Sequence, residues 1–323
     1  MPVPRSLRGK LVAPVIGAPM FLVSFPPLVA ALCKAGVIGT FPHVNARPAE
    51  QFEQWLCQME TELEQHRAAH PGAVVAPFGV NLVVHRTNPR FQGDLEVTVR
   101  HRVPLVLTSL GHPGEVVGPV HEYGGLVFSD VTNAAHARKA AQAGVDGLVC
   151  VGAGAGGHAS TQSTFSLVRE IREFWDGCLV LGGAIHDGGQ VRAAEALGAD
   201  FAYIGTRFIA SEESQASAGY TQMLVQAGVD DLVYTDRLSG IGCNFLKPSL
   251  AAHGVDPAVL PPKAPDLSVL TDSKARVWRD LWTAGHGVAT IHDVPPVGEI
   301  VARIAAEYRA ACALGPSPAL AGS

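Results

Sequence analysis

A run of small residues that ends in a histidine is the part of the sequence best suited to chemistry. Residues 147–152 form a short apolar segment that is typical of a buried strand, and the chain continues with A-G-A-G-G-H. Because glycine has no Cβ, backbone that includes Gly156 and Gly157 can approach a flat or anionic ligand closely. His158 would then stand at the exit of the strand and exchange a proton with that ligand. We interpret the run as a flavin-binding site with one acid–base residue.

A dinucleotide-binding loop is the alternative interpretation of the same run. Gly152, Gly154 and Gly157 match the G-x-G-x-x-G pattern that follows the first strand of a Rossmann fold. In that fold the third glycine lies in the first turn of a helix that packs on the strand. Here the next seven residues are H-A-S-T-Q-S-T, and helical periodicity resumes only near Phe165. The context therefore argues against a dinucleotide loop.

Two later apolar segments carry residues suited to a phosphate group. One of them, 179–185, contains Gly182 and Gly183, and the next one ends in Gly205 and Thr206. Backbone N–H groups in such glycine turns, together with a threonine hydroxyl, can bind a phosphate dianion. Each glycine alone could equally serve only to form a tight turn. Because two consecutive segments end in this way, we expect these residues to bind phosphate.

Two earlier apolar segments also end in residues that could contact a cofactor. Ala18 and Met20 close the first segment, where the main chain and a soft thioether can line the face of a ring. Asn81 lies at the end of the third segment, where its side-chain amide can pair with the edge of an isoalloxazine. The same asparagine could equally be a turn residue. We include all three among the expected cofactor contacts.

The elements that must position these residues alternate along the chain. Apolar, β-rich runs are separated by helical patterns, apart from one polar stretch that extends to Arg100. Eight strands are predicted, over residues 11–20, 37–41, 74–82, 105–110, 126–130, 147–152, 179–185 and 201–206. Continuous apolar strands indicate a parallel sheet that is covered on both faces. Eight βα units close most simply into an α/β fold of the (β/α)8 TIM barrel type, whose active site lies at the carboxyl ends of its strands. An open doubly wound sheet is the alternative.

The regular alternation stops after Thr206. Helical patterns are predicted beyond it, over residues 220–227, 270–281 and 297–314. The simplest arrangement is a small helical insertion after the eighth strand, followed by a last helix that completes the barrel. We therefore expect a cofactor-binding barrel, a substrate-covering insertion and C-terminal helices that complete the barrel, in residues 1–210, 211–270 and 271–323.

Composition excludes several functional classes. The net charge is −5 and no basic cluster is present, so nucleic acid is not an expected partner. No run approaches the roughly 18 apolar residues of a membrane-spanning helix, so no membrane association is expected. Six cysteines are scattered without a C-x-x-C pair, which favours reduced thiols in the cytoplasm. The chain has neither H-E-x-x-H spacing nor a G-x-S-x-G elbow, which argues against a metal site and a serine hydrolase.

With these residues in place, the sequence resembles the nitronate monooxygenase (2-nitropropane dioxygenase) family of FMN-dependent barrels over nearly its whole length. The A-G-G-H and G-T-R-F elements, in this order and spacing, are the most specific part of the resemblance. The matching segments are 18–20, 79–82, 155–158, 182–185, 204–208 and 282–285.

The resemblance implies a non-covalently bound FMN in a (β/α)8 barrel with a smaller substrate-covering domain. It implies that His158 acts as a base or as a partner of the substrate's nitro group. The residues that match FMN-binding positions of the family are Asn81, Gly156, Gly183, Gly205 and Thr206.

Three residues depart from the family pattern. Val151 stands where some members carry a glutamine, and Thr283 replaces a common serine. Asp130 ends the fifth predicted strand, where certain relatives place a lysine. A carboxylate there would be a poor stabiliser of an anionic flavin, unlike an ammonium group. We still include Asp130 among the residues expected to contact the cofactor.

The resemblance thus implies an FMN-dependent oxidoreductase that acts on a small molecule and O2. We expect it to oxidise alkyl nitronates, or nitroalkanes deprotonated by His158, to a carbonyl compound and nitrite. Sister enzymes on this scaffold leave a second function open, which is an NAD(P)H-dependent flavin reductase acting on quinones or an enoyl thioester. A third alternative is a barrel that binds a phosphorylated metabolite as a sensor or carrier and does no redox work. The oligomeric state is open, with a homodimer as one option.

Overall fold

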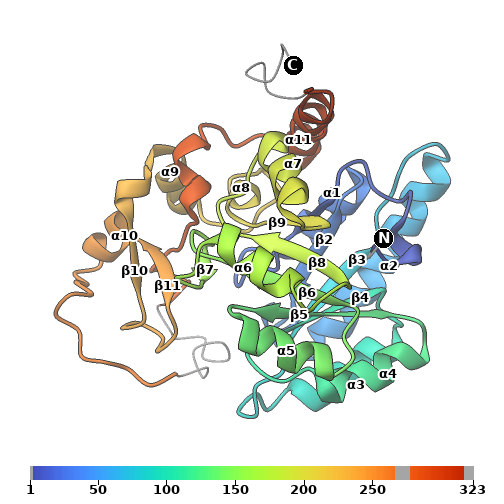
Figure 1. Ribbon diagram of the computed structural model, residues 1–323, viewed down its shortest axis with the longest axis horizontal. Helices are drawn as coiled ribbons and strands as arrows, with labels where there is room; N and C mark the ends of the chain where they lie inside the picture. Colours follow the sequence, from blue (N-terminus) through green and yellow to red (C-terminus); the bar gives the residue numbers. More distant parts are fainter. Residues whose placement is uncertain (1–2, 266–276, 316–323) are drawn as a thin grey trace.

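Eight parallel strands close into a barrel at the centre of the molecule (Figure 1). The computed structural model describes residues 3–265 and 277–315. The strands are hydrogen-bonded in chain order, and β1 pairs with both β2 and β9, which closes the ring. The predicted (β/α)8 TIM barrel is confirmed, and the open sheet is excluded. The barrel strands are β1 Val15–Gly17, β2 Ile38–Pro42, β3 Phe78–Val83, β4 Leu105–Ser109, β5 Leu126–Val131, β6 Gly147–Val151, β8 Cys178–Gly182 and β9 Phe201–Ile204.

Alternating side chains on each strand divide the core into two layers. Leu105 and Leu107 of β4 pack with Phe128 and other interior residues of the barrel. Val106, between them in the sequence, packs in the outer layer between strands and helices. Because both faces of each strand are covered, such strands need unbroken apolar segments. Their ends were harder to predict, as in β1, which is shorter than the predicted strand 11–20.

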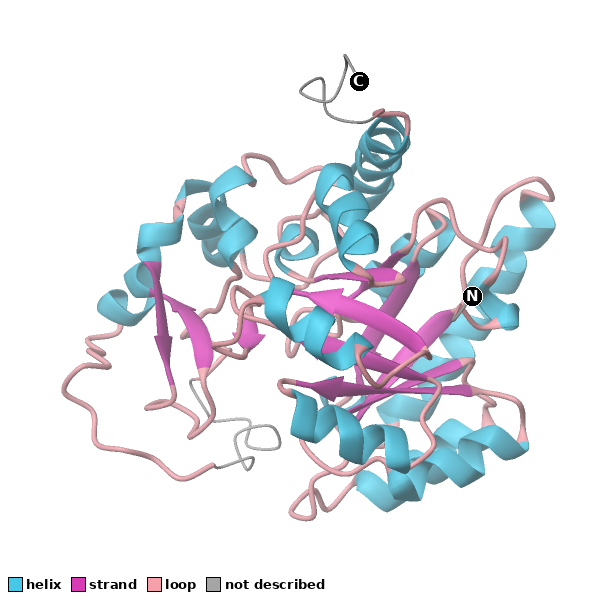
Figure 2. Ribbon diagram, in the orientation of Figure 1, coloured by secondary structure: helices cyan, strands magenta, loops and turns pink. Residues whose placement is uncertain are grey.

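Helices cover the outside of the barrel, as Figure 2 shows with cyan helices around magenta strands. The last helix, α11, packs against α7 and α1 and so takes the place of the eighth barrel helix. None of the helices within the described ranges combines the length and apolar content needed to cross a membrane. The barrel helices are α1 Pro26–Lys34, α2 Gln51–Ala69, α3 Phe91–Arg100, α4 Gly114–Glu122, α5 Ala134–Gln142, α6 Thr164–Arg172, α7 Gly188–Leu197 and α11 Val297–Cys312.

Helix α3 lies in the stretch that the sequence identified only as polar. Its buried face includes Asp94 and Thr98, which interrupt the apolar repeat that signals a helix. The Asp94 carboxylate has two partners, since its Oδ2 lies 2.5 Å from His43 Nδ1 and 2.9 Å from the Arg90 guanidinium. A buried carboxylate with two partners can therefore occupy a helix position that would otherwise be expected to carry an apolar residue.

The segment after β9 contains strands as well as the helices expected there. It includes two antiparallel strands, β10 and β11, and β11 also pairs with β7 (Gly157–His158). His158 is thus held in a three-stranded sheet beside the barrel (Figure 1). The predicted helix 270–281 lies mostly outside the described residues, and Val277 and Leu281 form an isolated bridge around a turn. The elements of this segment are α8 Thr206–Ile209, α9 Ala218–Gln226, β10 Leu232–Thr235, β11 Cys243–Leu246 and α10 Lys247–Ala252.

Short 3-10 helices complete the described elements. They are η1 Arg5–Leu7, η2 His43–Asn45, η3 Val229–Asp231 and η5 His286–Thr290.

The start of α7 is pressed directly against α11. The Asp187 side chain caps α7 by accepting a hydrogen bond from Gln190 N–H at 2.7 Å. The next residue, Gly188, donates its N–H to the Glu307 carboxylate of α11 at 2.9 Å. This approach is close because a Cβ on Gly188 would lie 2.2 Å from both Ile304 O and Tyr308 N. The closing helix therefore depends on a residue without a side chain.

Replacing Gly188 with alanine should lower the free energy of unfolding by about 1–3 kcal/mol, the usual cost of overpacking. The matched control is Gly189→Ala in the same turn, where the added Cβ would meet only Asp187 Oδ1 at 3.3 Å. That variant should be as stable as the parent or slightly more so, because alanine favours helix. Urea unfolding measures both, and equal stabilities of the two variants would contradict the close packing of α7 on α11.

Candidate active site

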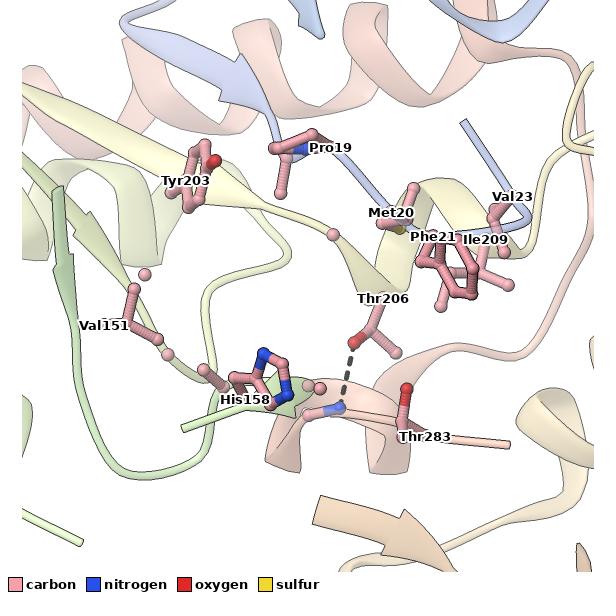
Figure 3. A pocket seen from close by; sticks show the side chains of 18 of the residues that line it. Pro19, Met20, Phe21, Val23, Val151, His158, Tyr203, Thr206, Ile209 and Thr283 are labelled. Carbon is pink, nitrogen blue, oxygen red and sulfur yellow. Dashed lines mark hydrogen bonds between the residues drawn. The ribbon is translucent and has the colours of Figure 1, made fainter. Parts of the chain in front are cut away.

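A cavity of about 220 Å³ lies at the carboxyl ends of the barrel strands (Figure 3). Parallel strands in a closed barrel bring these ends to one rim, so residues far apart in the sequence meet there. Every site residue predicted from the sequence lines this cavity. They are Ala18, Met20, Asn81, Asp130, Gly156, Gly157, His158, Gly182, Gly183, Gly205 and Thr206.

One side of the cavity is formed by backbone with almost no side chains. Gly183, after β8, has a φ of +132°, and a Cβ on it would lie 2.9 Å from Ala153 O. A Cβ on Gly156 would lie 2.9 Å from the backbone nitrogen of Gly285. That nitrogen donates a hydrogen bond to the Thr206 hydroxyl at 2.9 Å, the dashed line in Figure 3. Three loops thus meet closely at glycines, so this side of the cavity is lined by main chain.

The side chain of a buried asparagine makes three hydrogen bonds to the loop after β1. Asn45 donates from Nδ2 to the carbonyls of Met20 and Ser24 at 3.0 and 2.8 Å, and its Oδ1 accepts from Leu22 N–H at 2.8 Å. This fixes Met20 over the β9 exit, where its sulfur would be 3.5 Å from a Cβ on Gly205. The thioether expected to cover a ring face therefore lies against the glycine-lined side.

Asn81 is buried on β3 and its amide group is oriented by a neighbouring strand. Its Nδ2 donates to the Ser109 hydroxyl of β4 at 3.1 Å, and the same hydroxyl donates back to Asn81 Oδ1 at 3.2 Å. Asn81 is thus part of a strand. The alternative that it is a turn residue, which the sequence had left open, is wrong.

Two polar side chains without partners lie in the interior of the barrel rim. Asp130 comes from β5 and Tyr203 from β9, and both line the cavity. Asp130 Oδ1 and the Tyr203 hydroxyl are shielded from solvent and have no hydrogen-bond partner. Burial raises the pKa of Asp130 to about 7. Burial, and secondarily the Asp130 charge, raises the pKa of Tyr203 well above its ordinary value. Asp130 is therefore not the plain carboxylate that the sequence suggested, because its neutral form is well populated near pH 7.

His158 presents an uncharged ring to the cavity. Its strand β7 pairs with Cys243 and Asn244 of β11, and the Asn244 amide donates to Ala155 O at 2.8 Å. The ring packs edge-on against Trp278, with centroids 5.3 Å apart. Its Nε2 is buried and has no hydrogen-bond partner, and burial lowers the pKa of His158 to about 4. At neutral pH this nitrogen can exchange a hydrogen bond with a ligand, as acceptor or donor according to the tautomer of the neutral ring.

Several cavity residues were missed by sequence reasoning. Tyr203 could have been found, because it lies two residues after the inward-facing Phe201 in β9 and therefore points to the same face of the strand. His186 follows the predicted segment 179–185 directly, and its Nδ1 is buried without a partner. Trp278 gave no signal, since it comes from an irregular part of the chain that only tertiary structure returns to the rim. No group of three His, Cys, Asp or Glu side chains within the described ranges is placed to bind a metal ion.

Asp130 and His158 should change the pH dependence of stability in opposite directions. Folding raises the pKa of Asp130 from 3.8 to about 7, so the protein takes up a proton on folding between pH 3.8 and 7. The contribution of Asp130 to the free energy of unfolding therefore falls as pH rises through this range. Folding lowers the pKa of His158 from 6.5 to about 4, so its contribution falls as pH drops through this range. Between about pH 4 and 6.5, Asp130→Asn should therefore make the unfolding free energy rise more steeply with pH, and His158→Gln less steeply.

Each change of slope is bounded by about 1.4 kcal/mol per pH unit. Urea unfolding at a series of pH values, on protein freed of bound small molecules, measures the slopes. A change of the same sign in both variants would contradict the assigned burial of one of the two groups.

Comparison with known proteins agrees with this arrangement. The sequence model of the family described as nitronate monooxygenase matches residues 84–307. A nitronate monooxygenase of Paraburkholderia phytofirmans is 27% identical over 285 residues, which cover 76% of each protein. The (3aS,4S,5R,7aS)-5-hydroxy-7a-methyl-1-oxo-octahydro-1H-indene-4-carboxyl-CoA dehydrogenase of Mycobacterium tuberculosis is 27% identical over 241 residues, 73% of this chain and 64% of that protein.

Solved structures show the same fold. The nitroalkane oxidase from Streptomyces ansochromogenes superposes with a TM-score of 0.77 and 27% identity, covering 95% of this chain and 99% of that one. FabK from Thermotoga maritima superposes with a TM-score of 0.78 and 24% identity over 94% of each chain. The matched family region contains most of the barrel and the histidine-bearing strand, and the chain therefore belongs to the nitronate monooxygenase family and is an oxidoreductase.

Proposed function

We propose that this protein binds FMN and oxidises alkyl nitronates with O2 to a carbonyl compound and nitrite. The observation that carries the proposal is the uncharged, unpartnered imidazole of His158 beside a glycine-lined cavity at the barrel rim. Membership of the nitronate monooxygenase family supports the same reaction class.

The residues of the cavity fit FMN. The glycine turns at Gly183 and Gly205, with the Thr206 hydroxyl, suit the phosphate because no side chain obstructs the main chain there. The open hydrogen-bonding positions on Asp130 and Tyr203 suit the polar edge of the ring system. A neutral Asp130 could donate a hydrogen bond there, which removes the electrostatic objection to a carboxylate at this position. When bound, FMN would supply the electron transfer between substrate and O2.

The state of His158 favours nitronates over nitroalkanes as substrates. A neutral imidazole can take up the α-proton of a nitroalkane, but a pKa of about 4 makes it a weak base. A nitronate has already lost that proton and needs no base. Its negative charge beside the ring would raise the pKa of His158 again, so that the imidazole could donate a hydrogen bond to a nitro oxygen. We therefore infer that nitronates react faster and that nitroalkane turnover depends on His158.

Replacing His158 with alanine should lower nitroalkane turnover by at least about 100-fold, the usual contribution of a positioned base. Nitronate turnover should fall less, and the flavin absorbance of the purified protein should persist, because the glycine turns proposed to hold the phosphate are unchanged. Nitrite release and O2 consumption measure turnover. The control is His136→Ala, an exposed residue of α5 that does not line the cavity. Unchanged nitroalkane turnover in His158→Ala would remove the base from the mechanism.

Replacing Gly183 with alanine should weaken FMN binding at least tenfold. The position has a φ of +132°, and the new Cβ would lie 2.9 Å from Ala153 O, so the turn must leave the conformation proposed to hold the phosphate. Fluorescence titration of the apoprotein with FMN measures the affinity. Gly189→Ala, outside the cavity, is the control and should bind FMN as the parent does. Parent-like affinity in Gly183→Ala would show that this turn does not hold the phosphate.

An NAD(P)H-dependent flavin reductase acting on quinones or an enoyl thioester is the second candidate function. The observation that favours it is the similarity to a carboxyl-CoA dehydrogenase of Mycobacterium tuberculosis. Anaerobic mixing separates the two functions. Rapid bleaching of the flavin by NADH or NADPH would support the reductase, whereas bleaching by a nitronate alone supports nitronate oxidation.

A further inference from the structure

The cavity has an apolar side opposite in character to its glycine-lined side. Phe21, Val44, Val83, Leu110 and Trp278 all line the cavity and pack together as one cluster, which we call the apolar wall. The Phe21 and Trp278 rings meet edge to face with centroids 5.9 Å apart. Trp278 in turn touches the His158 ring, so the wall borders the proposed reaction site.

Two residues of the apolar wall are held in an unfavourable backbone conformation. Leu110 has a φ of +62° and Trp278 a φ of +64°, in the left-handed region that bulky residues rarely adopt. Strain of this kind persists only where surrounding structure imposes it, and it concentrates at functional sites. The fold therefore keeps two large hydrocarbon side chains at the rim against their local preference.

The apolar wall offers no partner for a charged substituent. Within residues 3–265 and 277–315, the side chains that line the cavity include no lysine or arginine. Arg47 lies 5.2 Å from the centre of the Phe21 ring, but it donates to Val44 O and does not line the cavity. A carboxylate against the wall would lose its hydration without compensation. A hydrocarbon group of the same shape would gain about fourfold in affinity for each methylene buried.

We propose that the apolar wall receives the hydrocarbon substituent of the substrate, so that this protein selects nitro compounds with uncharged alkyl or aryl groups and rejects those that carry a carboxylate. That the substrate is a nitro compound rests on the function proposed above. The selectivity itself rests on the wall and can be measured by binding alone.

Isothermal titration calorimetry of the flavin-loaded protein tests the selectivity. The two probes are 3-methyl-1-nitrobutane and 3-nitropropionate. The first carries an isopropyl group where the second carries a carboxylate of nearly the same shape. At pH 7 the alkyl compound should bind at least tenfold more tightly. Equal binding of the two, or tighter binding of 3-nitropropionate, would overturn the proposal.

Variants of Leu110 locate the selectivity. Leu110→Gly should weaken binding of 3-methyl-1-nitrobutane at least fourfold and leave 3-nitropropionate unchanged, without loss of folding stability, because glycine accepts a φ of +62°. Leu110→Arg should tighten 3-nitropropionate binding at least tenfold. The matched control is Ile241→Ala, since Ile241 packs in the same cluster but does not line the cavity, and it should bind both probes as the parent does. If Leu110→Gly and Ile241→Ala lose the same affinity for 3-methyl-1-nitrobutane, the selectivity does not arise from the apolar wall and the proposal is overturned.

Turnover separates failure of this inference from failure of the proposed function. If the alkyl compound binds more tightly but no nitronate is oxidised, the wall's selectivity stands and nitronate oxidation is wrong. If alkyl nitronates and propionate 3-nitronate are oxidised with equal kcat/KM, nitronate oxidation stands and the selectivity is wrong.

Discussion

Hydrogen bonding between β1 and β9 is the constraint on which the rest of the structure depends. It joins the first strand to the last and turns eight separate strand ends into one circular rim. The glycine turns after β8 and β9, the loop after β1 and the polar residues of β3 and β5 then face one another without any long-range sequence signal. Closure also leaves the barrel without an exposed sheet edge, so the rim is free to carry loops whose conformations serve a ligand.

The cavity combines two opposite environments that the same burial produces. Removing Asp130 and His158 from water disfavours the charged form of each, which leaves an acid with a raised pKa and a base with a lowered one. Neither group has a protein partner at its open atom, so each is available to a ligand. Such unpartnered buried atoms are destabilising in a resting protein and are tolerated where a ligand completes them.

The sequence was sufficient to predict the barrel and the convergence of eleven site residues, because both follow from local patterns. Unbroken apolar runs identify buried parallel strands, and glycines directly after them identify the rim. It was not sufficient where tertiary contacts replace local signals. Asp94 interrupts the apolar repeat of α3 because its buried partner His43 comes from elsewhere in the chain. Trp278 reaches the cavity from an irregular segment, and the protonation of Asp130 depends on desolvation that no sequence pattern records.

The pairing of β7 with β11 means that two distant parts of the chain together position His158. The imidazole of His158 belongs by sequence to the sixth βα loop, yet its strand is completed by residues more than eighty positions later. The additional strands thus hold the backbone of His158 beside the rim. Exchange of β10 and β11 between homologous enzymes would leave His158 in the chain but replace the strand that holds it, so under the proposed function substrate range and proton chemistry would change together.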